Sequence, residues 1–190
     1  MSDKKKKRVG LWVTLGALGF IIILLVGSLV FVEVSVKNLG SSLEEKQGQV
    51  VEAFEARSKV IDTLIDALKS KMSLDPEVFT ELENAEKTLN SANNVKSLSA
   101  ANLKVDAAID KLIFVMRDKY YYLETPELLK IEEDIDSARS RIVIESTDYN
   151  DVAKDYNYAI QNFPGDFLSN IFKHTPTDVF QIVDYEDITN

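Results

Sequence analysis

The chain has 190 residues, and its 22 basic and 31 acidic residues give a formal net charge of −9. It contains no cysteine, which excludes disulfide bonds, thiolate metal sites and a cysteine nucleophile. The single histidine, His174, is too few for a histidine-rich metal centre. The length suits one domain with an appendage, and a content of only 7 Gly and 4 Pro disfavours turn-rich β architectures.

The first 32 residues have the composition of a membrane anchor. Residues 4–8 are all basic, and the 24 residues of 9–32 contain no ionisable side chain. A helix over 9–32 would be about 36 Å long, enough to cross a hydrocarbon core of about 30 Å. The alternatives are a soluble core helix and a cleavable signal peptide, whose apolar region is only about 7–15 residues long. We therefore predict a basic tail over 1–8 and an uncleaved transmembrane anchor over 9–32.

The charges that flank the apolar segment predict its orientation. Lys and Arg favour the cytoplasmic side, so we expect a single-pass protein of the plasma or inner membrane with its N-terminus in the cytoplasm. Removing residues 1–32 takes away five cations and one acid, which leaves 17 basic and 30 acidic residues and a net charge of −13. Nucleic acid is a poor partner for that surface, and we expect the membrane and an envelope protein as partners.

Apolar side chains recur at helical spacing in four stretches of the remaining chain. We predict helices over about 43–71, from Asp75-Pro76-Glu77 to about residue 92, over about 25 residues up to Tyr120, and from Pro126 to Phe163. The last stretch keeps a 3–4 spacing, which predicts coiled-coil-like packing. Its seam positions are Leu128, Ile131, Ile135, Ala138, Ile142, Glu145, Tyr149, Val152, Tyr156, Ala159 and Phe163.

The predicted fold class is all-α. It combines a single N-terminal transmembrane helix with an extended antiparallel bundle of about four long helices over residues 33–164. Residues 165–190 form a C-terminal tail that follows Pro164-Gly165 and begins with a short amphipathic stripe, of Phe167, Leu168, Ile171 and Phe172. That stripe either folds back on the bundle or touches the membrane, and we favour the fold-back. An acidic segment with Phe180 and Tyr185 ends the tail.

Two seam positions in the predicted bundle are polar, Arg57 in its first helix and Glu145 in its last. In an up-down-up-down bundle these helices are antiparallel and their midpoints lie level. We hypothesise that Arg57 and Glu145 form a buried pair that fixes register. The alternative is that each long side chain reaches solvent at the rim of the seam.

Tyr149-Asn150 and Tyr156-Asn157 recur seven residues apart, which puts both tyrosines on the seam and both asparagines beside it. One interpretation is structural: the rings pack, and the hydroxyls and amides satisfy neighbouring carbonyls or fix helix register. The alternative is a polar and aromatic groove that holds a peptide or helix of a partner.

These motifs give the chain a resemblance to the LemA family of bacterial membrane-anchored helical proteins. The C-terminal signature consists of Arg141-Ile142, Tyr149-Asn150-Asp151-Val152, Tyr156-Asn157 and Phe163-Pro164-Gly165. In the first bundle helix the family pattern is matched by Phe54, Arg57, Val60-Ile61, Leu64-Ile65 and Lys69. The chain departs from the pattern at Lys59, Asp62, Ser146, Thr147 and Gln161. The resemblance implies a helical bundle outside a single membrane anchor, and no enzymatic activity follows from it.

The sequence offers no arrangement of residues for catalysis. It has no cysteine, its one histidine lies in the tail, and no glycine-rich loop follows a strand. Asp148, Asp151 and Asp155 share a helix face, but no turn is present to fold them around Ca²⁺. We expect no catalytic residue, no metal and no cofactor.

Two classes of function remain for a chain of this kind. The first is a membrane-tethered scaffold or adaptor that docks an envelope partner at a controlled height. The second is a ligand-sensing or regulatory ectodomain that signals through a membrane partner, since the eight residues expected in the cytoplasm are too few for an output domain. We favour the first.

Overall fold

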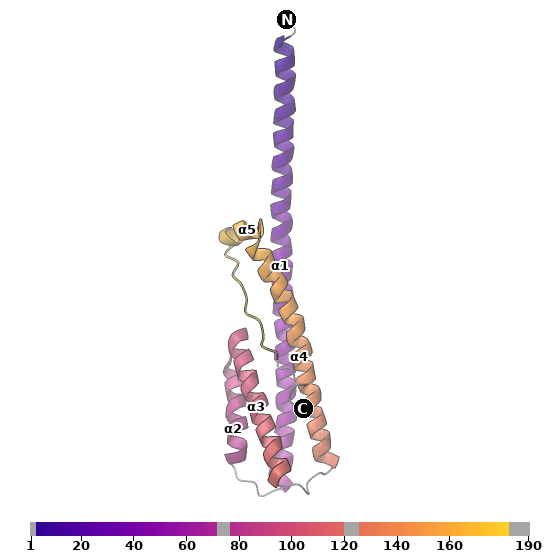
Figure 1. Cartoon of the computed structure of the whole chain (residues 1–190), viewed down its shortest axis with the longest axis vertical. Helices are drawn as coiled ribbons and strands as arrows, with labels where there is room; N and C mark the ends of the chain where they lie inside the picture. The colour runs from indigo at the N-terminus through magenta and orange to yellow at the C-terminus, as the bar shows by residue number, and fades with distance from the viewer. Residues whose placement is uncertain (1–2, 72–76, 120–125, 183–190) are drawn as a thin grey trace. The chain divides into compact units, whose positions relative to one another are not determined.

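The computed structural model describes residues 3–71, 77–119 and 126–182 of the chain. This part contains five helices and no strand, so the all-α prediction is confirmed. The helices are α1 Asp3–Lys71, α2 Glu77–Ser91, α3 Val95–Lys119, α4 Pro126–Gln161 and α5 Gly165–Phe172 (Figure 1). The predicted helix signals at Asp75-Pro76 and Tyr120, and Tyr185 of the tail, lie outside the described residues.

The described residues divide into two compact units. The first unit contains α1 up to Ser41 together with Lys154–Thr177, and the second contains Ser42–Ala153 together with residues from Asp178 onward. We call the second the bundle unit, because four helical segments lie alongside one another in it (Figure 1). These segments are the later part of α1, all of α2 and α3, and α4 up to Ala153.

The apolar stripes predicted for α1, α2 and α3 form the core of the bundle unit. Their members are almost completely buried, as expected for the inward faces of amphipathic helices. They include Val50, Phe54, Ile61, Leu64, Leu68, Leu82, Leu89, Val105, Ile109, Leu112 and Met116. Each fully buried side chain of this size contributes about 1.5–3 kcal/mol relative to an exposed one.

Surface ion pairs show that α1 and α4 are antiparallel within the bundle unit. Lys46 Nζ lies 2.8 Å from Asp148 Oδ2, and Glu52 Oε1 lies 3.6 Å from Arg141 Nη2. As the residue number rises along α1, it falls along α4. Exposed pairs of this kind contribute little stability, so they report the register of the two helices and do not enforce it.

The break that the sequence predicts between the second and third helices is a capping box. Ser97 N donates to Asn94 Oδ1 at 2.9 Å, and Asn94 N donates to Ser97 Oγ at 3.2 Å. The two polar side chains thus satisfy amide groups that a helix N-terminus leaves without helical partners. Asn94 is therefore the N-cap residue of α3, which begins at Val95.

The N-terminal helix contains the apolar segment expected of an anchor. Its most apolar window of 18 residues has a mean hydropathy of 2.8, and none of that window is buried. The helix is therefore long and apolar enough to cross a membrane. It continues without a break through residues 33–42, so the predicted anchor and the first predicted bundle helix are parts of one helix, α1.

The buried face of α4 is rotated by about one residue from the predicted seam over much of its length. Ile131, Ile135, Ile142 and Tyr149 are buried as expected. Where the apolar pattern selected Ala138, Glu145 and Val152, the structure buries the next residue along the helix: Arg139, Ser146 and Ala153. Phe163, the last predicted seam residue, is 81% exposed because α4 ends at Gln161. Arg139, a charged residue with hydrogen-bond partners, therefore occupies a core position that a search for apolar residues does not identify.

Candidate functional site

Arg57 lies in the core of the bundle unit, where it pairs with an aspartate of α3. Its side chain is fully buried, and its Nη1 donates to Asp106 Oδ1 at 2.8 Å. Asn102 Nδ2 donates to Asp106 Oδ2 at 3.2 Å. Arg139 Nη2 donates to the Asp106 carbonyl at 3.1 Å and to Asp110 Oδ1 at 2.6 Å. Two arginines thus converge on two aspartates, which balances the charge that burial would otherwise penalise.

This network replaces the predicted pair of Arg57 with Glu145. Glu145 pairs instead with Arg141 on its own helix, with 3.9 Å between Oε1 and Nε. The α4 residue that shares Asp106 with Arg57 is Arg139, which lies six residues, or about 9 Å of helix, from Glu145. The prediction aligned the midpoints of the two helices, and this alignment gave the wrong register. It also did not consider α3, which supplies the carboxylate of Asp106.

Asn150 holds the backbone of the C-terminal segment against the bundle unit through two hydrogen bonds. Asn150 Nδ2 donates to the Phe180 carbonyl at 2.9 Å, and Phe180 N donates to Asn150 Oδ1 at 2.7 Å. Gln181 N donates to Ser99 Oγ at 2.8 Å, and the Tyr149 hydroxyl donates to the Asp178 carbonyl at 3.2 Å. We call this set the Asn150 clamp. It recognises main-chain groups, as a neighbouring β-strand would.

The ring of Phe180 completes the Asn150 clamp. It is buried and meets two aromatic rings edge to face, with centroid distances of 5.1 Å to Tyr149 and 6.2 Å to Phe54. Such aromatic pairs contribute about 0.5–1.5 kcal/mol each beyond the area they bury. The bundle unit therefore binds one extended segment through its backbone and through one aromatic side chain.

Asn157 makes the equivalent contact within the first unit. Asn157 Nδ2 donates to the Thr177 carbonyl at 2.9 Å, and Thr177 N donates to Asn157 Oδ1 at 2.8 Å. Each of the two asparagines, within its own unit, therefore binds the amide and the carbonyl of a single residue in the segment after α5.

The sequence identified both asparagines but not the segment that they hold. Residues 177–182 have no helical or strand period that marks them as a partner of α4. The available signal was Phe180, an aromatic residue in an acidic tail, because such a side chain is rarely left in water by a folded chain. Of the predicted amphipathic stripe, Leu168 is buried, whereas Phe167, Ile171 and Phe172 are exposed.

Phe163-Pro164-Gly165 connects α4 to α5 in the first unit. Gly165 N donates to the Asn162 carbonyl at 2.7 Å. A Cβ atom on Gly165 would overlap the carbonyl oxygen of Ala159, so only glycine fits this close approach to the end of α4. The glycine of the signature is therefore explained by the turn, and the exposed Phe163 is not explained by core packing.

Tyr156 lies in the first unit near Glu33, the first charged residue after the apolar run of 9–32 in α1. Burial raises the pKa of the Tyr156 hydroxyl, and the nearby charge of Glu33 raises it further. Glu33 Oε2 also lies 3.2 Å from His174 Nε2, and Glu33 Oε1 lies 3.3 Å from Lys37 Nζ. These contacts connect α4 and the segment after α5 to the end of the apolar part of α1.

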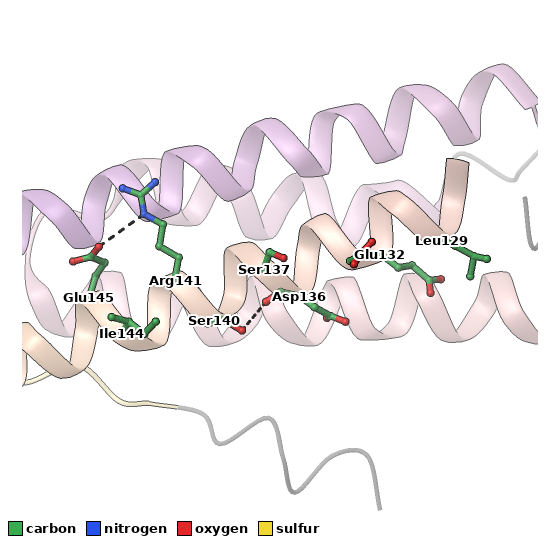
Figure 2. A pocket seen from close by; sticks show the side chains of 9 residues that line it. Leu129, Glu132, Asp136, Ser137, Ser140, Arg141, Ile144 and Glu145 are labelled. Carbon is green, nitrogen blue, oxygen red and sulfur yellow. Dashed lines mark hydrogen bonds and ion pairs between the residues drawn. The ribbon is translucent and has the colours of Figure 1, made fainter. Parts of the chain in front are cut away.

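Arg141 borders an open depression on the surface of α4 (Figure 2). The depression is lined by carboxylates and small polar groups, with Leu129 and Ile144 as its apolar members. In Figure 2 Arg141 points toward Glu145, its ion-pair partner. No histidine is among the residues that line the depression.

The described residues contain no cluster of three or more His, Asp or Glu side chains arranged to hold a metal ion. The expectation that the protein has no catalytic residue, metal or cofactor stays a prediction.

The fold and the clamp define a class of protein: an all-α helical bundle that follows a long apolar N-terminal helix and binds its own C-terminal segment. The sequence model of the LemA family matches residues 46–189, which is more than half of the chain. The chain therefore belongs to the LemA family. No curated protein matches the sequence significantly.

Proposed function

We propose that this chain is a non-enzymatic membrane-anchored scaffold or adaptor of the cell envelope. Its N-terminus lies in the cytoplasm, its bundle lies outside, and the bundle binds an extended segment of an envelope partner. The observation that carries the proposal is the Asn150 clamp, a site built for a peptide backbone and filled by the chain's own residues 178–181.

The orientation is supported by the five cations of residues 4–8, which lie on one flank of the apolar segment. The acidic composition that follows, with a net charge of −13 over residues 33–190, supports a protein partner over nucleic acid.

The chemistry of the clamp determines what kind of segment it accepts. Asn150 and Ser99 contact main-chain groups, so most residue types are tolerated at the positions they hold. The pocket between Phe54 and Tyr149 accepts an aromatic ring. A partner therefore needs an extended stretch with one aromatic residue, which is recognition by backbone pairing plus one side-chain pocket.

The tail competes with any partner for this site. Because the tail belongs to the same chain, its effective concentration at the clamp is high, on the order of millimolar for a short flexible connection. A partner must therefore offer additional contacts or a high local concentration, which membrane tethering provides.

The test locks the tail in place inside living cells. The native chain has no cysteine, so the double variant Ser99→Cys with Gln181→Cys creates a single candidate disulfide beside the hydrogen bond that joins these residues. Full-length tagged protein is cross-linked in intact cells and purified beside an anchor-only control. The two single-cysteine variants are the matched controls.

The adaptor proposal expects one or a few stoichiometric envelope partners that need the bundle and are lost on locking. Partners that persist when the disulfide has formed would show that the clamp is not their site. A purified protein with no partner, or with copies of itself only, would contradict the adaptor function. Protease added to spheroplasts tests the orientation, because a C-terminal tag outside the cytoplasm is digested.

A ligand-sensing or regulatory ectodomain is the second candidate function, and one observation favours it. α1 is uninterrupted from Asp3 to Lys71, so a change in helix packing has a continuous helix through which to act. A bundle whose thermal unfolding is insensitive to cell extracts and small ligands would contradict this candidate.

A further inference from the structure

The short helix α5 exposes apolar side chains that the core of its unit does not use. Leu168 is buried, whereas Phe167, Ile171 and Phe172 are 54%, 55% and 52% exposed. Phe163 and Tyr158, which precede α5 in the same unit, are exposed as well. Exposure of this much clustered apolar surface to water is energetically unfavourable.

Two contacts fix α5 relative to the apolar segment of α1. His174, just after α5, pairs with Glu33, and Lys37 Nζ lies 5.8 Å from the centroid of the Phe172 ring. Glu33 is the first ionisable residue after the apolar run of 9–32. All of these residues belong to the first unit.

The level of these contacts can be compared with the dimensions of a bilayer. Glu33 and Lys37 lie about 1.5 Å and 7.5 Å beyond Val32 along the helix axis. Each headgroup layer is about 5–7.5 Å thick, which is half of the difference between a total thickness of about 40–45 Å and a hydrocarbon core of about 30 Å. A helix held at Glu33 and Lys37 therefore lies at the headgroup layer when 9–32 spans the core.

We propose that α5 is an interfacial helix whose apolar side, formed by Phe167, Ile171 and Phe172, contacts lipid at the membrane surface where α1 leaves the bilayer. Helices of this type bury their apolar face about 5–10 Å into the boundary between headgroups and acyl chains. Lys37 lies close enough to extend its ammonium group to lipid phosphates, while its stem stays beside the Phe172 ring.

The inference rests on the anchor and is independent of the adaptor role. The experiment uses the absence of cysteine in the native chain. Single cysteines at Phe167, Ile171 and Phe172 are labelled with an environment-sensitive fluorophore in the full-length protein, reconstituted into phosphatidylcholine vesicles with and without phosphatidylglycerol. Exposed polar positions at the two ends of α5, Asp166 and Lys173, are the matched controls.

Lipids with a nitroxide at a shallow position quench fluorophores at the interface, and aqueous iodide quenches those in water. We expect the labels at Phe167, Ile171 and Phe172 to be quenched severalfold more by shallow nitroxide lipid, and severalfold less by iodide, than the labels at Asp166 and Lys173. Equal quenching at all five positions, or iodide quenching equal to that of soluble dye, would overturn the inference. Shielding that disappears when the protein is diluted into excess lipid would also overturn it, because it would assign the surface to a second copy.

A label at Ile21, in the middle of the apolar segment, separates failure of this inference from failure of the anchor. Strong quenching of the Ile21 label by deep nitroxide lipid with no lipid contact at α5 contradicts the interfacial helix alone. Loss of quenching at Ile21 contradicts the anchor, and the inference fails with it.

Discussion

The two units of this chain treat apolar residues in opposite ways. The bundle unit buries its main apolar side chains, and it also buries the charged residues Arg57 and Asp106. In the first unit, nearly all of the apolar side chains whose burial the structure describes are exposed. In the apolar window of α1, none of the surface is buried within the protein. The bundle unit thus supplies its own apolar environment, whereas the apolar segment of the first unit is long and apolar enough to cross a membrane.

Of the changes that test this comparison, we expect the largest loss of stability when Asp106, the ion-pair partner of Arg57 in the bundle unit, is removed. Asp106→Ala removes the carboxylate that pairs with the fully buried Arg57. We expect a loss of about 3–5 kcal/mol in the free energy of unfolding, the cost of stranding a buried charge. Denaturant unfolding followed by circular dichroism measures it. Asp110→Ala is the control, since Asp110 is partly exposed and its loss is expected to cost much less.

A pair of neighbouring residues in α5 tests the contrast within one helix. Leu168→Ala removes a buried side chain and is expected to destabilise the first unit by about 2–5 kcal/mol. Phe167→Ala removes an exposed one and is expected to change the stability in detergent by less than about 0.5 kcal/mol. Hydrogen exchange of the amides between residues 154 and 177 measures both. A large effect of Phe167→Ala would place that ring in a protein core and contradict the lipid contact.

The Asn150 clamp should open locally when its amide is removed. Asn150→Ala deletes two hydrogen bonds to Phe180, and we expect it to cost about 1–3 kcal/mol. Faster hydrogen exchange at the amides of Phe180 and Gln181, with the bundle helices unchanged, is the expected result. Asn162→Ala is the control, because Asn162 Nδ2 bonds to the Tyr158 carbonyl within the same turn region. Unchanged exchange at Phe180 would show that the aromatic pocket alone holds the tail.

The helices and much of the core could be predicted from the sequence, because both depend on local patterns. Val50, Ile61 and Leu64 follow a helical period, and Asn94 caps the start of α3 by bonding to a residue three positions away. The partners of Arg57 and Asn150 could not be predicted in the same way. Asp106 and Phe180 lie 49 and 30 residues away from them in sequence, and no local period records which helix or segment will face a side chain.

The smallest effect on stability is expected at Glu86 of α2. This carboxylate lies in the bundle unit, but it lacks the ion pairs with arginine that Asp106 makes. Burial raises the pKa of Glu86 above its usual value of 4.5, and the charges of Asp62 and Glu83 raise the pKa further, while a hydrogen bond from Ser58 and the charge of Arg57 oppose the rise. The folded protein therefore binds a proton at Glu86 more tightly than the unfolded chain does. Stability from this residue is complete below pH 4.5 and is lost as the pH rises through the raised pKa.

Glu86→Gln removes this penalty without changing the shape of the side chain. We expect the variant to unfold at a higher temperature than the native protein at pH 7, and the difference to vanish as the pH falls below 4.5. Glu133→Gln, at an exposed position of α4, controls for the loss of one surface charge. A stabilisation of Glu86→Gln that is the same at every pH would mean that the amide acts by a new hydrogen bond. In that case partial burial of the Glu86 carboxylate would carry no pH-dependent cost. The bundle unit would then tolerate a half-buried charge that lacks arginine pairs like those of Asp106.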